Sequence, residues 1–359
     1  MRVAVLGVGL IGGSIGLASR ARTDAEVSGW DPDGELLDRA LKLGAIESAA
    51  DSPAAAVHGA ELVFCAGPVA SLPRQGAEAM EASASECAVT DVGSVKREVI
   101  AALGEQPRFV GGHPLAGAET SGVENARADL FDGARWYLTP TGQTGGLHYD
   151  RVQRFVADLG ARPQAIDAER HDRLMATVSH LPHVLANLLV ARAADALTSD
   201  AGRLPEIGPS FRDATRVAGA NPAIWTDILS VNREAIAAEV EAVSGGLSEV
   251  AELLRAGDRE AVSSWQAAAG ERRRELVEGE LAGGALSELR VLVPNRPGIV
   301  AEIALALGRG AVNIEDMALH PAADMRSGAI SLFVAGDVEA ERAAELVREL
   351  GHDVVRVQR

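Results

Sequence analysis

The N-terminal sequence MRVAVLGVGLIGGSIGLA, residues 1–18, gives the clearest indication of the fold class. A β-rich run, Arg2–Leu6, leads into a glycine-rich turn, and a helical pattern follows it. Glycines at this spacing allow a tight turn, close approach of a pyrophosphate and close packing of helix on strand, while the helix N-terminus favours the anion. An ordinary glycine-rich turn is the alternative, but the flanking strand and helix favour a dinucleotide site. We predict that its loop consists of Gly7, Gly9, Leu10, Ile11 and Gly12.

Asp31 lies at the end of the next β-rich run, Glu26–Trp30. An acidic side chain about 20 residues beyond the glycine loop hydrogen-bonds the ribose hydroxyls of the adenosine and disfavours a 2′-phosphate. A surface aspartate beside an ordinary turn is the alternative interpretation. The position therefore favours NAD over NADP as the cofactor.

Short β-rich runs alternate with helical patterns over residues 1–167. This alternation is typical of a Rossmann-type α/β domain, an open parallel sheet with helices on both faces. The last strand or two are expected to be antiparallel additions. Further strands are predicted at Leu62–Cys65, Ala88–Asp91, Arg108–Gly111, Trp136–Thr139 and Arg162–Ile166, and helices at Gly34–Leu43 and Tyr149–Leu159.

The character of the sequence changes twice after residue 167. Residues 168–282 are rich in Ala, Leu, Glu and Arg and predict an all-α domain, and Leu281–Ala285 has the composition of a short linker. Residues 287–359 contain a β-α-β-β-α-β order, typical of a ferredoxin-like fold. The helices of the all-α domain are predicted at Ala168–Ser179, His183–Ala196, Asn221–Ser244, Leu247–Arg255 and Arg259–Leu281. The C-terminal elements are predicted at Glu288–Val293, Gly298–Gly308, Asn313–Leu319, Ala329–Ala335, Glu339–Leu350 and Asp353–Val357.

Composition argues against several classes of partner. The 359 residues carry a net charge of −17, whereas binding to nucleic acid relies on Lys and Arg. Cys65 and Cys87 lie in or beside apolar stretches, so we interpret them as buried reduced thiols rather than a disulfide. The chain begins without the basic region of a signal peptide, and no apolar run reaches the roughly 18–20 residues that span a bilayer. We expect a cytoplasmic protein that binds neither nucleic acid nor membrane.

Polar side chains follow two neighbouring strands of the predicted sheet. Ser94 lies in DVGSVK (91–96) after one strand, and His113 begins HPLAGAETSG (113–122) after the next. Ligands of such sheets bind beyond the carboxyl ends of the strands, so both loops are expected to face the nicotinamide. Ser94 can hydrogen-bond a substrate hydroxyl, and a histidine has an ordinary pKa suited to accepting its proton. Helix capping by Ser94 and a plain turn at His113 are the alternatives.

A third polar cluster lies in the predicted all-α domain. His180 and His183 are i, i+3 neighbours and project from one side of the chain, and Pro182 is expected to bend or restart the helix. No third ligand at metal-site spacing accompanies them, so no metal is predicted. Arg216 offers a fork that matches a carboxylate, and Trp225 supplies a flat wall. A surface arginine and a core tryptophan are the alternatives.

Together these motifs resemble the prephenate/arogenate dehydrogenase family of tyrosine biosynthesis, over essentially residues 1–280. The resemblance implies that a cyclohexadienol loses hydride to NAD⁺ and its ring carboxylate as CO₂. It implies that His113, assisted by Ser94, takes the proton of the ring hydroxyl and that Arg216 holds a substrate carboxylate. His180, His183 and Trp225 would line the side-chain end of the substrate, Glu119 would shape or gate the pocket, and His171 is carried over with less weight. The matching motifs are the glycine loop, DVGSVK (91–96), HPLAGAETSG (113–122), HDRLMATVSHLPH (171–183), FRDATR (211–216) and NPAIW (221–225).

The C-terminal segment resembles an ACT domain, a small regulatory module that binds amino acids. The resemblance rests on VPNRPGIVA (293–301) and VNI (312–314). It implies feedback by an amino acid, tyrosine in particular, although a domain that serves only dimerisation is the alternative. The family resemblance and the long apolar helices both imply a homodimer. The implied effector site contains Asn295, Pro297, Gly298, Asn313 and Ile314.

Two other functions fit parts of the sequence. A β-hydroxyacid or imine-reducing dehydrogenase shares the plan of a Rossmann domain followed by helices, but places a catalytic lysine on the helical domain, and no lysine follows Lys96. A sensor of nucleotide and amino acid that lacks turnover would keep both binding modules, and the set of Ser94, His113 and Arg216 argues against it. Prephenate is the first substrate hypothesis and arogenate the second: His183 favours a keto acid, and Glu119 favours an ammonium group.

Overall fold

The computed structural model describes residues 1–117, 122–198, 207–280, 286–310, 312–314, 316–321 and 327–357. The chain forms two compact units, Met1–Leu247 and Ser248–Arg359. The predicted linker Leu281–Ala285 lies outside the described residues.

An eight-stranded sheet with the order β3-β2-β1-β4-β5-β6-β7-β8 forms the centre of the first unit. The six strands from β3 to β6 are parallel, β7 is antiparallel to β6, and β8 runs parallel to β7. The predicted Rossmann-type sheet and its antiparallel end are thus confirmed. The chain order reverses between β1 and β4, where sheets of this kind bind ligands. The strands are β1 (Arg2–Leu6), β2 (Glu26–Trp30), β3 (Ser48–Ala49), β4 (Leu62–Cys65), β5 (Ala88–Asp91), β6 (Phe109–Pro114), β7 (Arg135–Thr139) and β8 (Arg162–Ala165).

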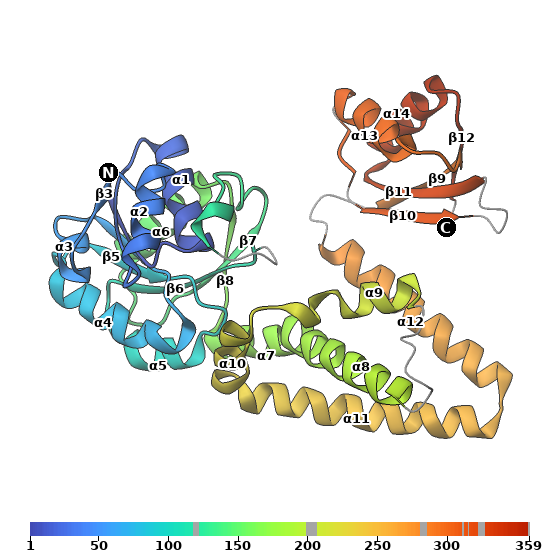
Figure 1. The fold of residues 1–359 in the computed structure, drawn as a ribbon, viewed down its shortest axis with the longest axis horizontal. Helices are drawn as coiled ribbons and strands as arrows, with labels where there is room; N and C mark the ends of the chain where they lie inside the picture. Colours follow the sequence, from blue (N-terminus) through green and yellow to red (C-terminus); the bar gives the residue numbers. More distant parts are fainter. Residues whose placement is uncertain are drawn as a thin grey trace. The chain divides into compact units, whose positions relative to one another are not determined.

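Helices cover both faces of this sheet (Figure 1). On one face, α1 (Leu10–Thr23), α2 (Gly34–Lys42) and α6 (Gly146–Asp158) enclose a core with Phe64 and Trp136. The other face is covered by α3 (Pro53–Val57), α4 (Leu72–Ala82) and α5 (Arg97–Leu103). Because its residues are buried on both faces, β4 is apolar throughout.

A helical segment follows the sheet and holds one departure from regular α-helix. The helices α7 (Ala168–Met175) and α8 (Leu181–Thr198) are joined by a π-helical turn, Ala176–His180, in which the Leu181 N–H donates to the carbonyl of Ala176. We expected Pro182 to bend or restart the helix. A new helix, α8, does begin at Leu181 with Pro182 in its first turn, but a π-helical turn that was not predicted precedes it, an arrangement frequent at functional sites.

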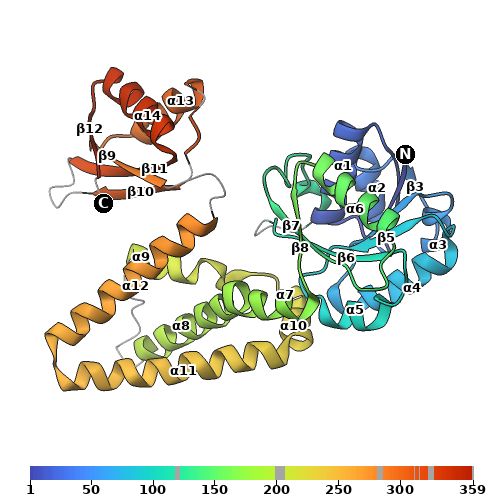
Figure 2. The same cartoon turned by 180° about the vertical axis from the view of Figure 1, so that it is seen from behind.

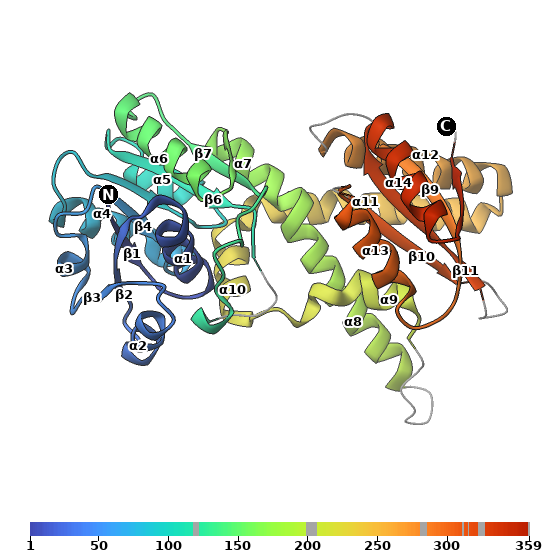
Figure 3. The same ribbon diagram turned by 90° about the horizontal axis from the view of Figure 1, so that it is seen from above.

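The predicted helix Asn221–Ser244 is wrong at one point. It is divided into α10 (Pro222–Val231) and α11 (Arg233–Ala256) by Asn232, whose backbone is not helical. Conversely, α11 continues through Gly245 and Gly246 and includes the predicted helix Leu247–Arg255, so the predicted helix end at Ser244 is wrong. The other elements are α9 (Pro209–Thr215), the 3-10 turn η4 (Arg216–Gly219) and α12 (Arg259–Glu280); α9 and η4 pack against α8 (Figure 3).

Among the described residues, one helical run, Ala168–Asp195, is long and apolar enough to cross a membrane by length and composition alone. This corrects the expectation that no such run exists. A core helix of a globular protein can have the same length and apolar composition, so a single helix of this kind is weak support for a membrane span. The run carries buried His171, Asp172 and His180, which belong to the site described below.

The second unit contains a four-stranded antiparallel sheet with the order β10-β11-β9-β12. The helices α13 and α14 lie on one side of it (Figures 1 and 2). Leu289 and Leu332 from the sheet meet Ile303 and Val347 from the helices in its core. The predicted β-α-β-β-α-β order is therefore confirmed. Its elements are β9 (Leu286–Pro294), α13 (Ile299–Arg309), β10 (Asp316–Pro321), β11 (Ser327–Ala335), α14 (Asp337–Glu349) and β12 (Asp353–Arg356).

Candidate active site

The glycine loop between β1 and α1 has the geometry of a dinucleotide site. Gly7 adopts φ +100°, a conformation that side chains disfavour, and its N–H donates to the Trp30 carbonyl at 2.8 Å. A Cβ on Gly12 would lie 1.9 Å from the Gly7 carbonyl oxygen, so only glycine lets α1 pack this closely. A Cβ on Gly9 would meet nothing within 4 Å. That open space lies at the start of α1, where no side chain caps the free N–H groups, so the residues present fit a pyrophosphate.

Asp31 is tied to the same loop. One of its carboxylate oxygens accepts from the Val8 N–H at 3.0 Å, and the other accepts from the Asp33 N–H at 3.0 Å. These bonds hold the carboxylate beside the loop and leave further lone pairs for ribose hydroxyls. The residues around β1 and β2 therefore fit NAD.

A buried ion pair anchors the two loops that follow β5 and β6. Lys96 and Asp91 are 0% and 1% exposed and form a salt bridge, and the Lys96 ammonium also donates to the Gly112 carbonyl at 2.6 Å. Asp91 accepts from the N–H groups of Gly93 at 2.8 Å and Gly112 at 3.0 Å. Burial lowers the pKa of Lys96, and the Asp91 carboxylate opposes this shift. The pair connects the loop that carries Ser94 to the strand that carries His113.

His113 is joined to two residues at the start of the helical segment. Its Nδ1 lies 2.9 Å from Nε2 of His171, and Nδ1 of His171 lies 2.8 Å from Oδ1 of Asp172. Asp172 also accepts from the N–H groups of Lys96 at 2.7 Å and Arg97 at 2.9 Å, which caps the start of α5. Hydrogen bonds thus connect these three side chains in a row, from the carboxyl end of β6 to α7.

His113 and His171 are both held neutral. Burial lowers the pKa of His113 well below 6.5, and the neighbouring His171, Lys96 and His180 lower it further. Burial also lowers the pKa of His171, although the hydrogen bond to Asp172 opposes the shift. His113 is thus an unprotonated imidazole at neutral pH, the state that a general base needs.

His180, His183 and Trp225 form one aromatic group. The His183 ring stacks on Trp225 with centroids 3.5 Å apart and an interplanar angle of 3°, and the His180 ring meets the indole edge-on at 6.0 Å. Burial lowers the pKa of His180 to about 4 and also lowers that of His183. Nδ1 of His183 is buried without a hydrogen-bond partner among the residues described. The group presents neutral imidazoles rather than cations.

Asn232 connects this aromatic group to the hydrogen-bonded row of His113, His171 and Asp172. Its amide nitrogen donates to the Asp172 carbonyl at 2.9 Å and lies 3.2 Å from Nδ1 of His180. A carbonyl only accepts, so the nitrogen of the amide must face it. Nδ1 of His180 then accepts the second amide proton, and the ring proton lies on Nε2. Asn232 makes these contacts from the break between α10 and α11.

The structure brings together four of the predicted site residues through His171, which the family resemblance also implied, and through Asp172 and Asn232, which were not predicted. His113, His180, His183 and Trp225 are connected by His171, Asp172 and Asn232. Asp172 follows a histidine that the motif already singled out, whereas no pattern marks Asn232. The remaining predicted residues are placed as follows: Ser94 is half-buried before α5, Arg216 is exposed at the start of η4, and Glu119 lies outside the described residues. In the described part of the chain, no group of three His, Cys, Asp or Glu side chains suits a metal ion.

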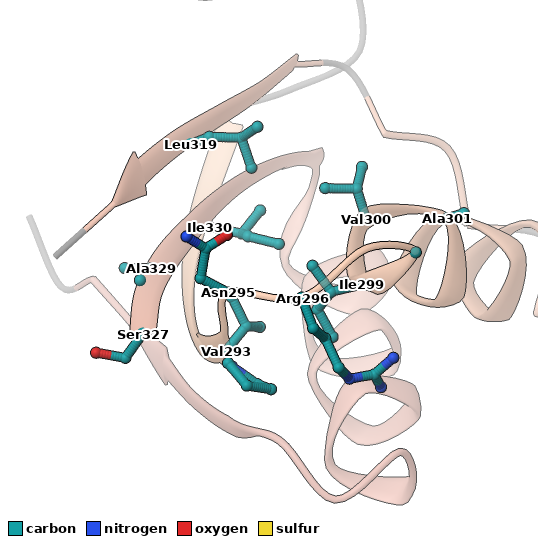
Figure 4. Close-up of a pocket in the computed structure, with 13 residues that line it drawn as sticks. Val293, Asn295, Arg296, Ile299, Val300, Ala301, Leu319, Ser327, Ala329 and Ile330 are labelled. Atoms are coloured by element: carbon teal, nitrogen blue, oxygen red, sulfur yellow. The ribbon is translucent and has the colours of Figure 1, made fainter. Parts of the chain in front are cut away.

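A separate pocket of about 500 Å³ lies in the second unit (Figure 4). Asn295 and Arg296 line it at the turn after β9, and apolar residues of α13, β10 and β11 complete the wall. Of the predicted effector residues, Asn295 and Gly298 line this pocket. Ile314 packs against the apolar core of the unit instead.

Two family matches cover most of the first two predicted domains. Residues 15–164 match "Prephenate dehydrogenase, nucleotide-binding domain", and residues 167–267 match "Prephenate dehydrogenase, dimerization domain". The prephenate dehydrogenase of Bacillus subtilis is 30% identical over 360 residues, covering 96% of this chain and 95% of that protein. The cyclohexadienyl dehydrogenase of Zymomonas mobilis is 34% identical, covering 65% of this chain and 82% of that protein.

Solved structures agree with these matches. The prephenate dehydrogenase of Aquifex aeolicus, in complex with hydroxyphenyl propionate and NAD⁺, has a TM-score of 0.73 and 30% identity, covering 77% of this chain and 98% of that one. The arogenate dehydrogenase of Synechocystis has a TM-score of 0.65 and 25% identity, covering 77% of this chain and all of that one. The chain belongs to the prephenate dehydrogenase family.

Proposed function

We propose that this protein is an NAD-dependent prephenate dehydrogenase, which converts prephenate and NAD⁺ to 4-hydroxyphenylpyruvate, CO₂ and NADH. The observation that carries the proposal is His113. It is a neutral imidazole whose Nδ1 is already bonded to His171, which leaves Nε2 for a substrate hydroxyl. Family membership supports the same reaction.

The residues divide the work of the reaction. The glycine loop and Asp31 would hold NAD⁺, which would supply the hydride acceptor. His113 accepts the proton of the ring hydroxyl, and Ser94 hydrogen-bonds the same oxygen. Loss of CO₂ makes the ring aromatic, which supplies most of the driving force, so the protein mainly orients the reacting carbon and manages one proton.

Arogenate is the second candidate substrate, because relatives of both specificities match this chain. The two compounds differ by a keto group against an ammonium at the end of the side chain. We propose that His183 and Trp225 contact that end, and a neutral imidazole favours the keto acid. Purified protein with NAD⁺ and each compound in turn is expected to form NADH faster from prephenate. Absence of NADH with either compound, NADP⁺ also tried, would exclude the dehydrogenase.

Arg216 is proposed to hold a substrate carboxylate. We expect Arg216→Ala to lower kcat/KM for prephenate about 10²-fold, mainly through KM, because a charge-assisted bond is worth ~1.5–3 kcal/mol. Arg216→Lys should recover only part of this loss, since an ammonium lacks the planar fork. Arg212→Ala, exposed one turn earlier, is the matched control in steady-state kinetics. Equal effects at the two positions would remove Arg216 from the site.

Asp31 is proposed to select NAD. We expect Asp31→Ser to raise the KM for NAD⁺ at least about tenfold, because a charged hydrogen-bond partner of the ribose is lost, and to improve the use of NADP⁺. Initial rates with both cofactors measure the change in preference. Asp33→Ser is the control. The Asp33 side chain caps α2, whereas the Asp31 side chain accepts from the Val8 N–H of the glycine loop. An unchanged preference would show that Asp31 serves only the loop.

We further propose a cytoplasmic homodimer with the three domains 1–167, 168–282 and 287–359. The matched dimerization domain supports the dimer, and only 33% of the apolar window in Ala168–Asp195 is buried within one chain. The free, buried Cys65 and Cys87 fit a reducing compartment. In the second unit, the β-α-β-β-α-β order and the pocket beside Asn295 support an ACT-like domain that binds an amino acid, tyrosine being the first candidate.

A further inference from the structure

With both histidines neutral and Asp172 ionised, the hydrogen bonds around His171 allow one arrangement of protons. The Asp172 carboxylate oxygen accepts, so Nδ1 of His171 must carry the proton that points to it. A neutral His171 then has a lone pair on Nε2, which accepts from Nδ1–H of His113 across 2.9 Å. The remaining nitrogen of His113, Nε2, is left as a lone pair. The order Asp172, His171, His113 therefore determines which nitrogen of His113 is basic.

We propose that His171 and Asp172 are positioning residues that fix the basic tautomer of His113 and share the proton it receives. The inference rests on the proposed role of His113 and deepens it. The proton of the substrate hydroxyl moves to Nε2 of His113, and the Nδ1 proton of His113 passes to Nε2 of His171. Only N–H and O–H bonds change. The positive charge then lies on His171, whose Nδ1–H stays 2.8 Å from the Asp172 carboxylate.

The charged groups around the two histidines favour transfer of the proton to His171. The Lys96 ammonium opposes a cation at His113, but its own partner is Asp91. His180 also opposes the charge, while Tyr137 faces His171 through its ring edge. Asp172 is the carboxylate bonded directly to the histidine pair. The groups that face the pair are Asp91 and Lys96 from β5 and its loop, Tyr137 from β7, Asp172 from α7 and His180 from the π-helical turn.

The test compares His171→Leu with His171→Gln. Leucine removes the acceptor for Nδ1–H of His113, so we expect kcat to fall on the order of 10²- to 10³-fold, with the KM for NAD⁺ unchanged. When the catalytic histidine of a serine protease is held in the wrong tautomer, kcat falls by even more, about 10⁴-fold. Glutamine places an amide near the position of Nε2, so it should recover at least about tenfold of this loss. His58→Gln, an exposed histidine, is the matched control. Equal kcat values for the Leu and Gln variants would contradict the proposal.

Two further measurements separate positioning from mere structure. Long-range ¹H–¹⁵N spectra of the full chain, with His113→Asn for assignment, should show His113 with its proton on Nδ1 in the native protein and not in His171→Leu. In Asp172→Asn, the acidic limb of kcat/KM should move to lower pH, because the charge that stabilises the protonated pair is removed. A proton found on Nε2 of His113 in the native protein overturns the proposal even if the enzyme turns over. Conversely, a protein that gives the expected spectra but forms no NADH refutes the proposed function alone.

Discussion

His113→Asn is expected to lower kcat by about 10³- to 10⁴-fold, at the upper end of what a general base contributes. Asparagine still hydrogen-bonds the ring hydroxyl but takes no proton at neutral pH. The glycine loop and Asp31 are untouched, so the KM for NAD⁺ should stay close to that of the native enzyme. NADH absorbance in steady state measures the loss, and circular dichroism checks that the variant folds.

The pH profile of the native enzyme tests the same residue independently. Because burial holds the pKa of His113 well below 6.5, its base form persists as the pH falls below neutrality. We therefore expect kcat/KM to decline on the acidic side only well below pH 6.5, and this limb to vanish in His113→Asn. His58→Asn, on the surface after α3, should keep both the rate and the profile. An acidic limb at or above pH 6.5 would assign the proton to another group.

Local patterns were sufficient to predict the cofactor half of the site. The requirement for glycine at Gly7 and Gly12 arises within a few residues of backbone, and the placement of Asp31 follows from one strand–helix–strand unit. Strand–helix alternation likewise predicted the parallel sheet, and its end at β7 and β8, because each element buries its own apolar face. These features depend on residues that are close in sequence, so local patterns can predict them.

The catalytic half depends on contacts between distant residues. The amide of Asn232 donates to the Asp172 carbonyl, 60 residues earlier, a partner that no local pattern identifies. The π-helical turn before Pro182 was missed because the proline predicted a break and not the wider turn that accommodates it. Asp172 caps α5 at Lys96 and Arg97, more than 70 residues away, a contact that no local pattern predicts. Sequence motifs therefore point to His113 and His171, but not to the contacts that connect them to Asp172 and Asn232.

Lys96→Met is expected to lower the free energy of unfolding by about 3–5 kcal/mol, the usual cost of removing one partner of a buried ion pair. The substitution leaves the Asp91 carboxylate buried with only the N–H groups of Gly93 and Gly112, and it deprives the Gly112 carbonyl of its partner. Methionine has nearly the same length, so the loss reports the charge rather than a cavity. Urea unfolding followed by circular dichroism measures it.

The chain offers a matched control, because its only other lysine, Lys42, is exposed at the end of α2. Lys42→Met should change the free energy of unfolding by no more than about 0.5 kcal/mol. The double variant Lys96→Met/Asp91→Asn should recover part of the loss, because it removes the unpaired charge while an amide oxygen still accepts one of the glycine N–H groups. A Lys96→Met variant as stable as Lys42→Met would mean that the ion pair does not hold the two loops together. The spacing between Ser94 and His113 would then depend on Asp172 and the capped start of α5 alone.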